Sequence, residues 1–224
     1  IVSNTEMVMP RRMGGGSLRL DGEDVGGLVR WIAHDAFIFG GNSGGPLIDM
    51  NGQIIGINEI SFALAGAIPG NLAKRVAEAL MESGEVERSW LGVMIQPLFK
   101  SQSESTGAFV AGAVKGSPAD DAGIESGDIL LSVNGAPTRV RFDEDMPILN
   151  RLLSELPIGQ EIELSIMRDG KEKILKVTPT ERESRESKQS ELKEWGMTVR
   201  NITFMMAKEL RRKNQDGVYI TSIR

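Results

Sequence analysis

The sequence contains no cysteine and only one histidine and one tyrosine. The lack of cysteine excludes disulfides, thiol catalysis and cysteine-ligated metal sites. Because a zinc site of the usual kind needs several histidines, we expect no metal, and no motif indicates another cofactor. No apolar run approaches the roughly 20 residues that a membrane-spanning helix needs. The net charge of −5 gives no reason to expect a nucleic acid as a partner.

The composition is that of an ordinary globular protein, with 40% hydrophobic and 25% charged residues. A chain of 224 residues is long enough for one large domain or two smaller ones. It starts at Ile1 without the basic and apolar regions of a signal peptide, and both ends have the pattern of strands. We therefore expect a piece of a longer protein.

The segment before residue 70 is predicted to consist of strands and loops. Residues 8–27 include a run of three glycines and predict a long mobile loop. A strand is predicted at residues 28–32. Residues 47–49 and 54–58 flank the turn Met50-Asn51-Gly52, which indicates a hairpin.

A helix is predicted after these strands. Leu72, Val76 and Leu80 recur at the spacing of one helix face. Asn71 is the predicted N-cap of this helix, and Gly84 is the predicted terminator. We expect the charged residues after Gly84 to be a linker into a second unit.

The second unit is predicted to combine short strands with helical pieces. The pairs Asn134-Gly135 and Asp169-Gly170 predict tight turns. Leucines spaced three and four residues apart predict an amphipathic helix over 144–156 that ends before Pro157. The predicted strands lie at residues 109–111, 129–133, 162–166 and 173–177.

The pattern restarts near the end of the chain. Residues 181–190 contain no apolar side chain and predict a solvated linker. After them, residues 195–199 are similar to residues 90–94. We therefore expect residues 191–224 to be an incomplete second copy of the second unit.

Ser43 lies in the turn Gly40-Gly41-Asn42-Ser43-Gly44-Gly45-Pro46. Glycines around a serine let the backbone turn sharply and direct two N–H groups at one position. The pattern predicts that Ser43 Oγ is a nucleophile and that the N–H groups of Gly41 and Ser43 form an oxyanion hole. The alternative is a glycine-rich hairpin with an incidental serine.

This turn resembles the nucleophile motif of the HtrA/Deg family of chymotrypsin-fold serine proteases. The resemblance implies that residues 1–84 are the C-terminal part of a chymotrypsin-like β-barrel. It also implies that the catalytic histidine and aspartate of the family lie in sequence that precedes Ile1. Other segments similar to the family are residues 31–36, 52–58, 67–69 and 73–76.

His34 could be offered as the base that Ser43 needs. The resemblance places His34 where the family usually has threonine, on a strand that leads into the nucleophile turn. In chymotrypsin-like folds the histidine and then the aspartate come before the serine, well upstream in the chain. We therefore expect His34 to be a local substitution that is partly exposed or hydrogen bonded. Asp35 and Asp49 have no better claim to be the acid of the triad.

The resemblance also implies where a substrate would lie. The residues expected to line the pocket for the side chain before the scissile bond are Ile38, Phe39 and Gly40. They carry no acid, so small or medium aliphatic side chains are expected there; core packing of the first two is the alternative. The strand edge expected to bind substrate backbone by β-addition consists of Asn58, Glu59 and Ile60.

Residues 116–135 resemble the PDZ domains of bacterial proteases almost residue for residue. The resemblance implies a PDZ domain over 88–180 and makes 191–224 the start of a second PDZ-like domain. A loop of consecutive N–H groups would hold the carboxylate of a peptide C-terminus. The helix leucines would form the opposite wall or only fill the core, and Trp90 could be a packing residue at the domain junction. The peptide-binding residues expected on this basis are Trp90, Leu91, Gly92, Val93, Leu149, Leu152 and Leu153.

These features predict a mainly β fold with some α: the C-terminal part of a chymotrypsin-like β-barrel, a PDZ domain and the start of a second PDZ-like domain. By resemblance, the parent protein is a serine endopeptidase of the periplasm or cell envelope that cleaves misfolded proteins, recognises peptide C-termini and forms homotrimers. We expect this chain to be inactive alone, because it lacks the upstream histidine and aspartate. The alternative is an inactive protease-like scaffold that acts only as a peptide-binding module.

Overall fold

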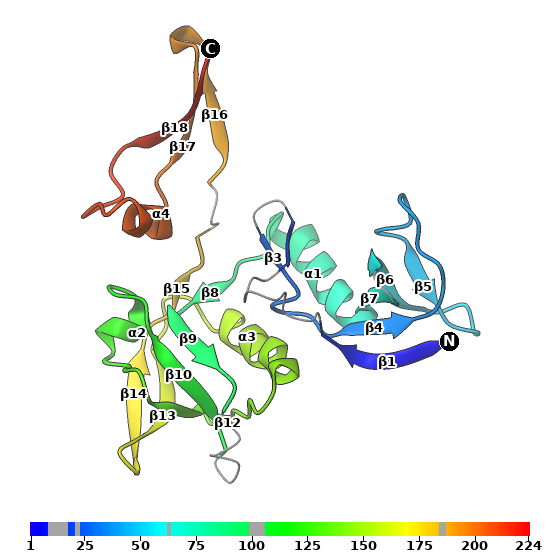
Figure 1. The fold of residues 1–224 in the computed structure, drawn as a ribbon, viewed down its shortest axis with the longest axis horizontal. Helices are drawn as coiled ribbons and strands as arrows, with labels where there is room; N and C mark the ends of the chain where they lie inside the picture. Colours follow the sequence, from blue (N-terminus) through cyan, green and yellow to red (C-terminus); the bar gives the residue numbers. More distant parts are fainter. Residues whose placement is uncertain (9–17, 21–22, 62–63, 99–105, 184–186) are drawn as a thin grey trace. The chain divides into compact units, whose positions relative to one another are not determined.

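The computed structural model divides the chain into two compact units. The first unit consists of Ile1–Leu18 and Val25–Glu181, and the second of Arg19–Asp24 and Arg182–Arg224. Figure 1 shows the helices and strands of both units. The structure describes residues 1–8, 18–20, 23–61, 64–98, 106–183 and 187–224.

A five-stranded antiparallel sheet forms the first part of the first unit (Figure 1). Its strand order is β1-β4-β7-β6-β5. At Gly56 on β6 an added Cβ would lie 2.8 Å from Ile68 O on β7. A residue with a side chain would therefore not fit between these two strands. The strands are β1 Val2–Met7, β4 Trp31–His34, β5 Pro46–Ile48, β6 Ile54–Ser61 and β7 Ala65–Pro69.

The predicted hairpin is present as β5 and β6. Its turn is closed by Asp49, whose Oδ1 accepts the N–H groups of Gln53 at 2.9 Å and Asn51 at 2.8 Å. These bonds hold the pKa of the Asp49 carboxyl below its usual range, and the bond from the Gln53 N–H has the largest effect. The strand predicted from residue 28 begins only at Trp31, because residues 26–29 form a turn.

The predicted helix is α1 (Gly70–Ser83). It ends as expected at Gly84, whose N–H donates to Leu80 O at 3.0 Å. The predicted N-cap was wrong: Pro69, with extended dihedral angles, occupies that position. Asn71 lies inside the first turn, where its Oδ1 accepts the N–H of the next residue.

A second sheet follows in the first unit (Figure 1). Its strand order is β14-β13-β11-β10-β9, with β12 paired to β11, so β9 is an edge strand. All four predicted strands are confirmed, and Asn134 and Asp169 adopt positive φ in the predicted turns. The strands are β9 Val93–Gln96, β10 Ala108–Ala113, β11 Ile129–Val133, β12 Ala136–Pro137, β13 Ile162–Arg168 and β14 Lys171–Val177.

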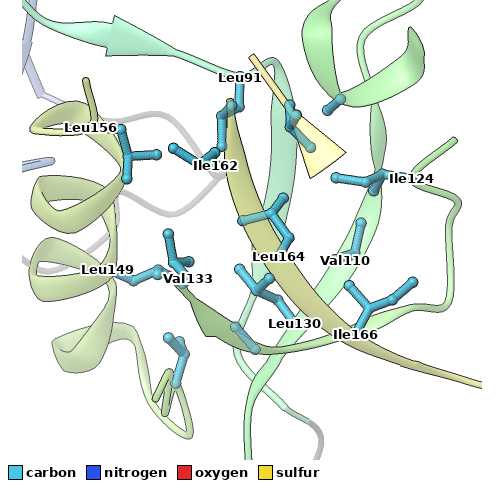
Figure 2. Close-up of a cluster of buried hydrophobic side chains, with 14 residues drawn as sticks. Leu91, Val110, Ile124, Leu130, Val133, Leu149, Leu156, Ile162, Leu164 and Ile166 are labelled. Atoms are coloured by element: carbon cyan, nitrogen blue, oxygen red, sulfur yellow. The ribbon is translucent and has the colours of Figure 1, made fainter. Parts of the chain in front are cut away.

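One hydrophobic core lies between this sheet and α3 (Met146–Ser154). Figure 2 shows Leu149 and Leu156 reaching from the helical side toward apolar side chains of the sheet. The helix predicted over 144–156 is shorter in the structure, because Asp143–Asp145 forms a 3-10 turn before it.

Two smaller elements complete the first unit. α2 (Pro118–Asp121) starts at Ser117, whose Oγ accepts the N–H of Asp120 at 3.3 Å. β8 (Ser89–Trp90) pairs with β15 (Thr180–Glu181) in a separate two-stranded sheet. The pair β8–β15 joins the two ends of the segment that contains the second sheet.

A buried ion pair connects the turn before β11 to the end of β13. Asp128 is 1% exposed and accepts two hydrogen bonds from Arg168, at 2.6 Å from Nε and 2.7 Å from Nη2. Arg168 also donates to Glu125 Oε1 at 2.7 Å and Gly123 O at 2.8 Å. Burial by itself raises the pKa of Asp128. The bonds from Arg168 and from the Glu125 N–H outweigh burial and hold this pKa below its usual value.

Arg168→Met is expected to lower the free energy of unfolding by about 3 kcal/mol at neutral pH, because it leaves a buried carboxylate without its cation. Since the folded-state pKa of Asp128 is lowered, the ionised carboxylate stabilises the wild type above the unfolded pKa of about 3.9. This contribution is lost as the pH falls through the folded-state pKa. Urea denaturation of both proteins at pH 7 and in acid should therefore show a difference that shrinks in acid.

Lys176→Ala is the matched control for this prediction. The Lys176–Glu161 pair has the same short separation, 2.7 Å, but both side chains are mostly exposed. Solvent-exposed pairs contribute little, so this variant should lose much less stability than Arg168→Met. Equal losses would contradict a special role for the buried pair.

The second unit contains a three-stranded antiparallel sheet with the order β16-β17-β18, the helix α4 and a 3-10 turn at Lys193–Trp195 (Figure 1). The helix α4 (Phe204–Glu209) is capped by Thr203, whose Oγ1 accepts the N–H of Met206 at 3.3 Å. The strands are β16 Gln189–Leu192, β17 Met197–Asn201 and β18 Val218–Ile223. β16 thus begins inside the segment predicted to be a linker, of which residues 184–186 lie outside the described residues.

The segment predicted to be a long mobile loop, 8–27, is described only in part. β2 (Leu18–Leu20) pairs with β3 (Glu23–Val25), so this part is a strand pair and not a loop. Residues 9–17 and 21–22 lie outside the described residues. In the portion of the chain that the structure describes, no helix is long and apolar enough to span a bilayer.

Candidate active site and peptide groove

The turn that carries Ser43 lies between β4 and β5 and is hydrogen bonded to β6. Asn42 N–H donates to the carbonyl three residues earlier at 3.0 Å, and Gly45 N–H donates to Asn42 O at 3.0 Å. Gly44 N–H donates to Asn58 O at 2.8 Å, and Asn58 N–H donates to Gly45 O at 2.9 Å. Backbone hydrogen bonds on both sides of Ser43 therefore set its position.

The hydroxyl of Ser43 is exposed, and its Oγ donates to Glu59 O at 3.3 Å. Gly41 has a φ of 103°, which side-chain-bearing residues rarely adopt. Within the described residues, neither the Gly41 N–H nor the Ser43 N–H donates to another group of the chain. A hydroxyl next to two unengaged N–H groups is the arrangement that an acyl-transfer site requires.

His34 is 2% exposed, so it is buried and not partly exposed. Its strand β4 is paired on both sides, by β1 and β7. The expected hydrogen bond is present: His34 Nε2 lies 3.1 Å from Asn58 Oδ1. Because Asn58 Nδ2 donates to Pro46 O, its Oδ1 accepts, and His34 Nε2 is the donor. No hydrogen bond joins His34 to Ser43 in the described part of the chain.

The two nearby aspartates have other partners. Asp35 is exposed, and its backbone N–H donates to Ile1 O at 3.2 Å. Asp49 belongs to the hairpin turn between β5 and β6. Neither carboxylate forms a hydrogen bond with His34 or Ser43 among the described residues.

An exposed aromatic pair precedes the nucleophile turn. Phe39 is 70% exposed and Phe37 is 86% exposed, and their rings stack with centroids 6.2 Å apart. Ile38 between them is half-buried, and Gly40 is exposed. Phe39 therefore does not pack in the core, which was the alternative to a pocket residue. Phe37 was not selected from the sequence, since nothing in its local pattern marks it.

The expected substrate edge lies at an irregular point of β6. Asn58 and Ile60 oppose consecutive residues of β7, so Glu59 between them occupies a β-bulge. Glu59 Oε2 accepts the indole N–H of the fully buried Trp31 at 2.5 Å. Ile60 is buried, whereas Asn58 and Glu59 are half-buried. Sequence reasoning did not find Trp31, because it lies 28 residues from its partner.

The loop before the edge strand β9 has its carbonyl groups turned into the unit. Leu91 O accepts the N–H of Ala119, and Gly92 O accepts the N–H of Val114, both at 2.8 Å. The N–H groups of Leu91 and Gly92 have no acceptor among the described residues. A loop with inward carbonyls and free N–H groups is suited to bind a carboxylate.

The other predicted groove residues lie around the core of the second sheet. Leu149 is buried within this core. Leu152, Leu153 and Val93 are half-buried and pack at its margin. Trp90 is half-buried on β8. The structure therefore brings β9 and the C-terminal half of α3 to one apolar cluster, with Leu149 serving mainly to fill it.

Comparison with known proteins decides the family. Residues 89–178 match the family model described as a PDZ domain. A relative from Ectopseudomonas mendocina, named "Probable periplasmic serine endoprotease DegP-like", is 40% identical over 163 residues, 67% of this chain and 33% of the relative. A relative of the same name from Chlamydia trachomatis is 36% identical over 193 residues, 80% of this chain and 38% of the relative.

Solved structures agree with these relatives. The structure titled "HtrA-type protease AlgW with tripeptide" superposes with a TM-score of 0.65 and 28% identity, covering 81% of this chain and 59% of that one. The serine endoprotease from Yersinia pestis gives a TM-score of 0.55 and 32% identity over 69% of this chain and 53% of that one. The chain belongs to the HtrA/Deg family. It spans about a third of the length of the curated relatives it matches.

Membership of the HtrA/Deg family confirms the predicted fold class. The fold is mainly β, and it corresponds to the C-terminal part of a chymotrypsin-like barrel followed by a PDZ domain. The first sheet with α1 precedes the PDZ match, and the second sheet with α3 lies within it. Over the residues whose positions are described, no three His, Cys, Asp or Glu side chains are grouped so that they could hold a metal ion.

Proposed function

We propose that this HtrA/Deg chain carries the nucleophile of a serine endopeptidase of the periplasm or cell envelope. The observation that carries the proposal is the Ser43 turn, which presents an exposed hydroxyl beside the unengaged N–H groups of Gly41 and Ser43 among the described residues. The names of the relatives support both the activity and the compartment. A glycine-rich hairpin with an incidental serine would not need this backbone arrangement.

In the proposed reaction, Ser43 Oγ attacks the carbonyl carbon of the scissile peptide bond and passes its proton to a general base. The N–H groups of Gly41 and Ser43 stabilise the oxyanion that forms. The amine then leaves with that proton, and water hydrolyses the acyl–Ser43 ester. His34 does not act as the base, since it is buried and donates to Asn58. The base and its acid come from residues outside this chain.

The proposed substrate path follows β6. Strand pairing between β5 and β6 ends at Ile57, and the backbone of Asn58 is bonded to Gly44 and Gly45 of the nucleophile turn. Beyond Asn58, this edge of β6 has no strand partner among the described residues, so Glu59 and Ile60 are proposed to accept a substrate strand, with Asn58 beside them. The residues proposed to contact the side chain before the scissile bond are Ile38, Phe39 and Gly40. The exposed ring of Phe39 supports an apolar pocket and a preference for aliphatic substrate side chains.

The PDZ domain is proposed to bind the C-termini of peptides. The free N–H groups of Leu91 and Gly92 among the described residues support a carboxylate site. The edge of β9 that pairs with no other described strand supports pairing with the peptide backbone. Leu152 and Leu153 at the margin of the core support an apolar pocket for the last side chain of the peptide. Trp90 and Val93 flank the same loop, and Leu149 supports the pocket from the core.

We infer the remaining properties from the family: the substrates are misfolded proteins, the assembly is a homotrimer, and the domains span 1–84, 88–180 and 191–224, with a linker inside 181–190 that ends where β16 begins. A second candidate function is an inactive protease-like scaffold that only binds peptides. The observation that favours it is that the single histidine of this chain is buried and bonded to Asn58, with no hydrogen bond to Ser43 among the described residues.

Casein hydrolysis tests the endopeptidase proposal. The protein that contains this chain together with the sequence preceding it is expected to cleave casein, because that sequence supplies the base and acid. This chain alone is expected to show no measurable cleavage. A longer protein without a histidine and an aspartate at the positions of the family, and without activity, would leave the scaffold as the function. Cleavage by this chain alone would contradict the assignment of the base.

Isothermal titration calorimetry tests peptide binding by this chain. A short peptide that ends in valine with a free carboxylate should bind with saturation. Its C-terminal amide should bind more weakly, because the amide loses the charge that the N–H groups attract. Equal binding of both peptides would contradict a carboxylate site.

A further inference from the structure

Ser89 makes two hydrogen bonds that no sequence pattern indicates. It lies on β8, directly before the loop with the free N–H groups, and is 5% exposed. Its Oγ donates to Leu153 O in a short bond and accepts the N–H of Leu156 at 3.2 Å. One hydroxyl therefore acts as donor and acceptor at the same time. Leu153 lies in the last turn of α3 and Leu156 follows the end of this helix, 64 and 67 residues away in the chain.

These bonds satisfy backbone groups that a helix end leaves without partners. The last carbonyls of α3 have no N–H of the helix to accept, and the residues after it must find acceptors elsewhere. Leu153 also carries one of the side chains at the margin of the apolar cluster. The end of α3 that forms the proposed pocket is thus held by a side chain of β8.

The backbone of β8 is also held, by pairing with β15. Ser89 opposes Glu181 and Trp90 opposes Thr180 in the pair with β15. The loop that follows is fixed by the inward carbonyls of Leu91 and Gly92. Ser89 is therefore the side chain that links the loop with free N–H groups to the helix that faces it.

We propose that Ser89 is a positioning residue of the peptide groove, which sets the separation between the carboxylate loop and α3. This inference rests on the proposed binding of peptide C-termini. A peptide end has a carboxylate and an apolar side chain on the same residue, so the loop and the pocket must lie at one fixed separation to bind both. Without the Ser89 bridge, each part can still bind, but not both in their best positions.

Ser89→Ala tests the proposal. The affinity for the valine-ending peptide should fall about tenfold, because the free energy of one average hydrogen bond corresponds to a change of that size in the dissociation constant. The affinity for its C-terminal amide should change little, so the preference for the free carboxylate should fall by about the same factor. Both affinities are measured by isothermal titration calorimetry well below the unfolding temperature, with folding checked by circular dichroism.

Ser154→Ala is the matched control. Ser154 is also buried and lies on α3, but its Oγ donates to Arg151 O at 2.9 Å within the same helix. It removes a hydroxyl from the same helix without touching β8, so the preference for the free carboxylate should stay as in the wild type. Ser89→Cys keeps the size of the side chain with weaker hydrogen bonding, and should reproduce Ser89→Ala if the alanine variant does not fold.

The outcomes separate this inference from the proposed function. If the wild type binds both peptides equally, the proposed recognition of peptide C-termini is wrong, and the proposed role of Ser89 is overturned as well. If the wild type prefers the free carboxylate and the Ser89 variants keep that preference, only the role of Ser89 is overturned. A loss of preference in the Ser154 control equal to that in the Ser89 variants would also overturn it, since any damage to α3 would then suffice.

Discussion

Replacing Ser43 with alanine is expected to lower kcat for casein hydrolysis by about a thousandfold or more in the HtrA/Deg protein that contains this chain. The hydroxyl is the attacking atom in the proposed reaction, and no other side chain on the turn can replace it. KM should change little, because backbone groups and pockets bind the substrate. The measurement is steady-state hydrolysis of casein by the two purified proteins.

The fold of the turn should survive this substitution. Asn42, Gly44 and Gly45 hold the turn through backbone bonds, and the Ser43 hydroxyl contributes one long bond to Glu59 O. Thermal unfolding of Ser43→Ala should therefore match that of the wild type. Under this expectation, lost activity reports lost chemistry and not lost structure.

Ser83→Ala supplies the matched control. Ser83 lies at the end of α1, where its Oγ lies 3.0 and 2.8 Å from the carbonyl oxygens of Ala79 and Glu85 and can donate its proton to either. This variant removes a better-bonded hydroxyl than Ser43→Ala does, yet kcat should stay at the wild-type value. Activity that survives Ser43→Ala would mean that another group attacks the substrate, and the nucleophile assignment would be wrong.

Features set by neighbouring residues could be predicted from the sequence. The hairpin between β5 and β6 follows from a short polar turn between two apolar runs. The end of α1 could be predicted from Gly84, because glycine readily adopts the left-handed conformation that ends a helix. The start of α1 was harder to predict, since Pro69 and Asn71 are both common at helix starts and only the backbone angles distinguish them.

Contacts between residues far apart in the chain could not be predicted. Glu59 meets Trp31 because a bulge in β6 turns its side chain, and no pattern of alternating residues contains a bulge. Ser89 meets the end of α3 because the β8–β15 pair places it there. The burial of His34 likewise follows from strands on both sides of β4, although its hydrogen bonding was expected.

Gly92→Ala is expected to abolish measurable peptide binding and to lower the free energy of unfolding by about 3 kcal/mol or more. Gly92 has a φ of 75°, so any side chain there is strained. An added Cβ would also lie 2.3 Å from Ser117 Cβ, and Ser117 is fully buried at the start of α2. The loop would have to move away from α2, which breaks the inward bonds of its carbonyls and turns its N–H groups.

Gly135→Ala separates the clash at Gly92 from backbone strain. Gly135 has nearly the same φ, 77°, but an added Cβ there would meet nothing within 4 Å. The two variants therefore share the cost of a positive φ, about 1–2 kcal/mol, and only Gly92→Ala has the contact with Ser117. Calorimetry with the valine-ending peptide should show wild-type affinity for Gly135→Ala. If Gly92→Ala also binds normally while losing the same stability, the loop is not held by its contact with Ser117, and its N–H groups do not form the carboxylate site.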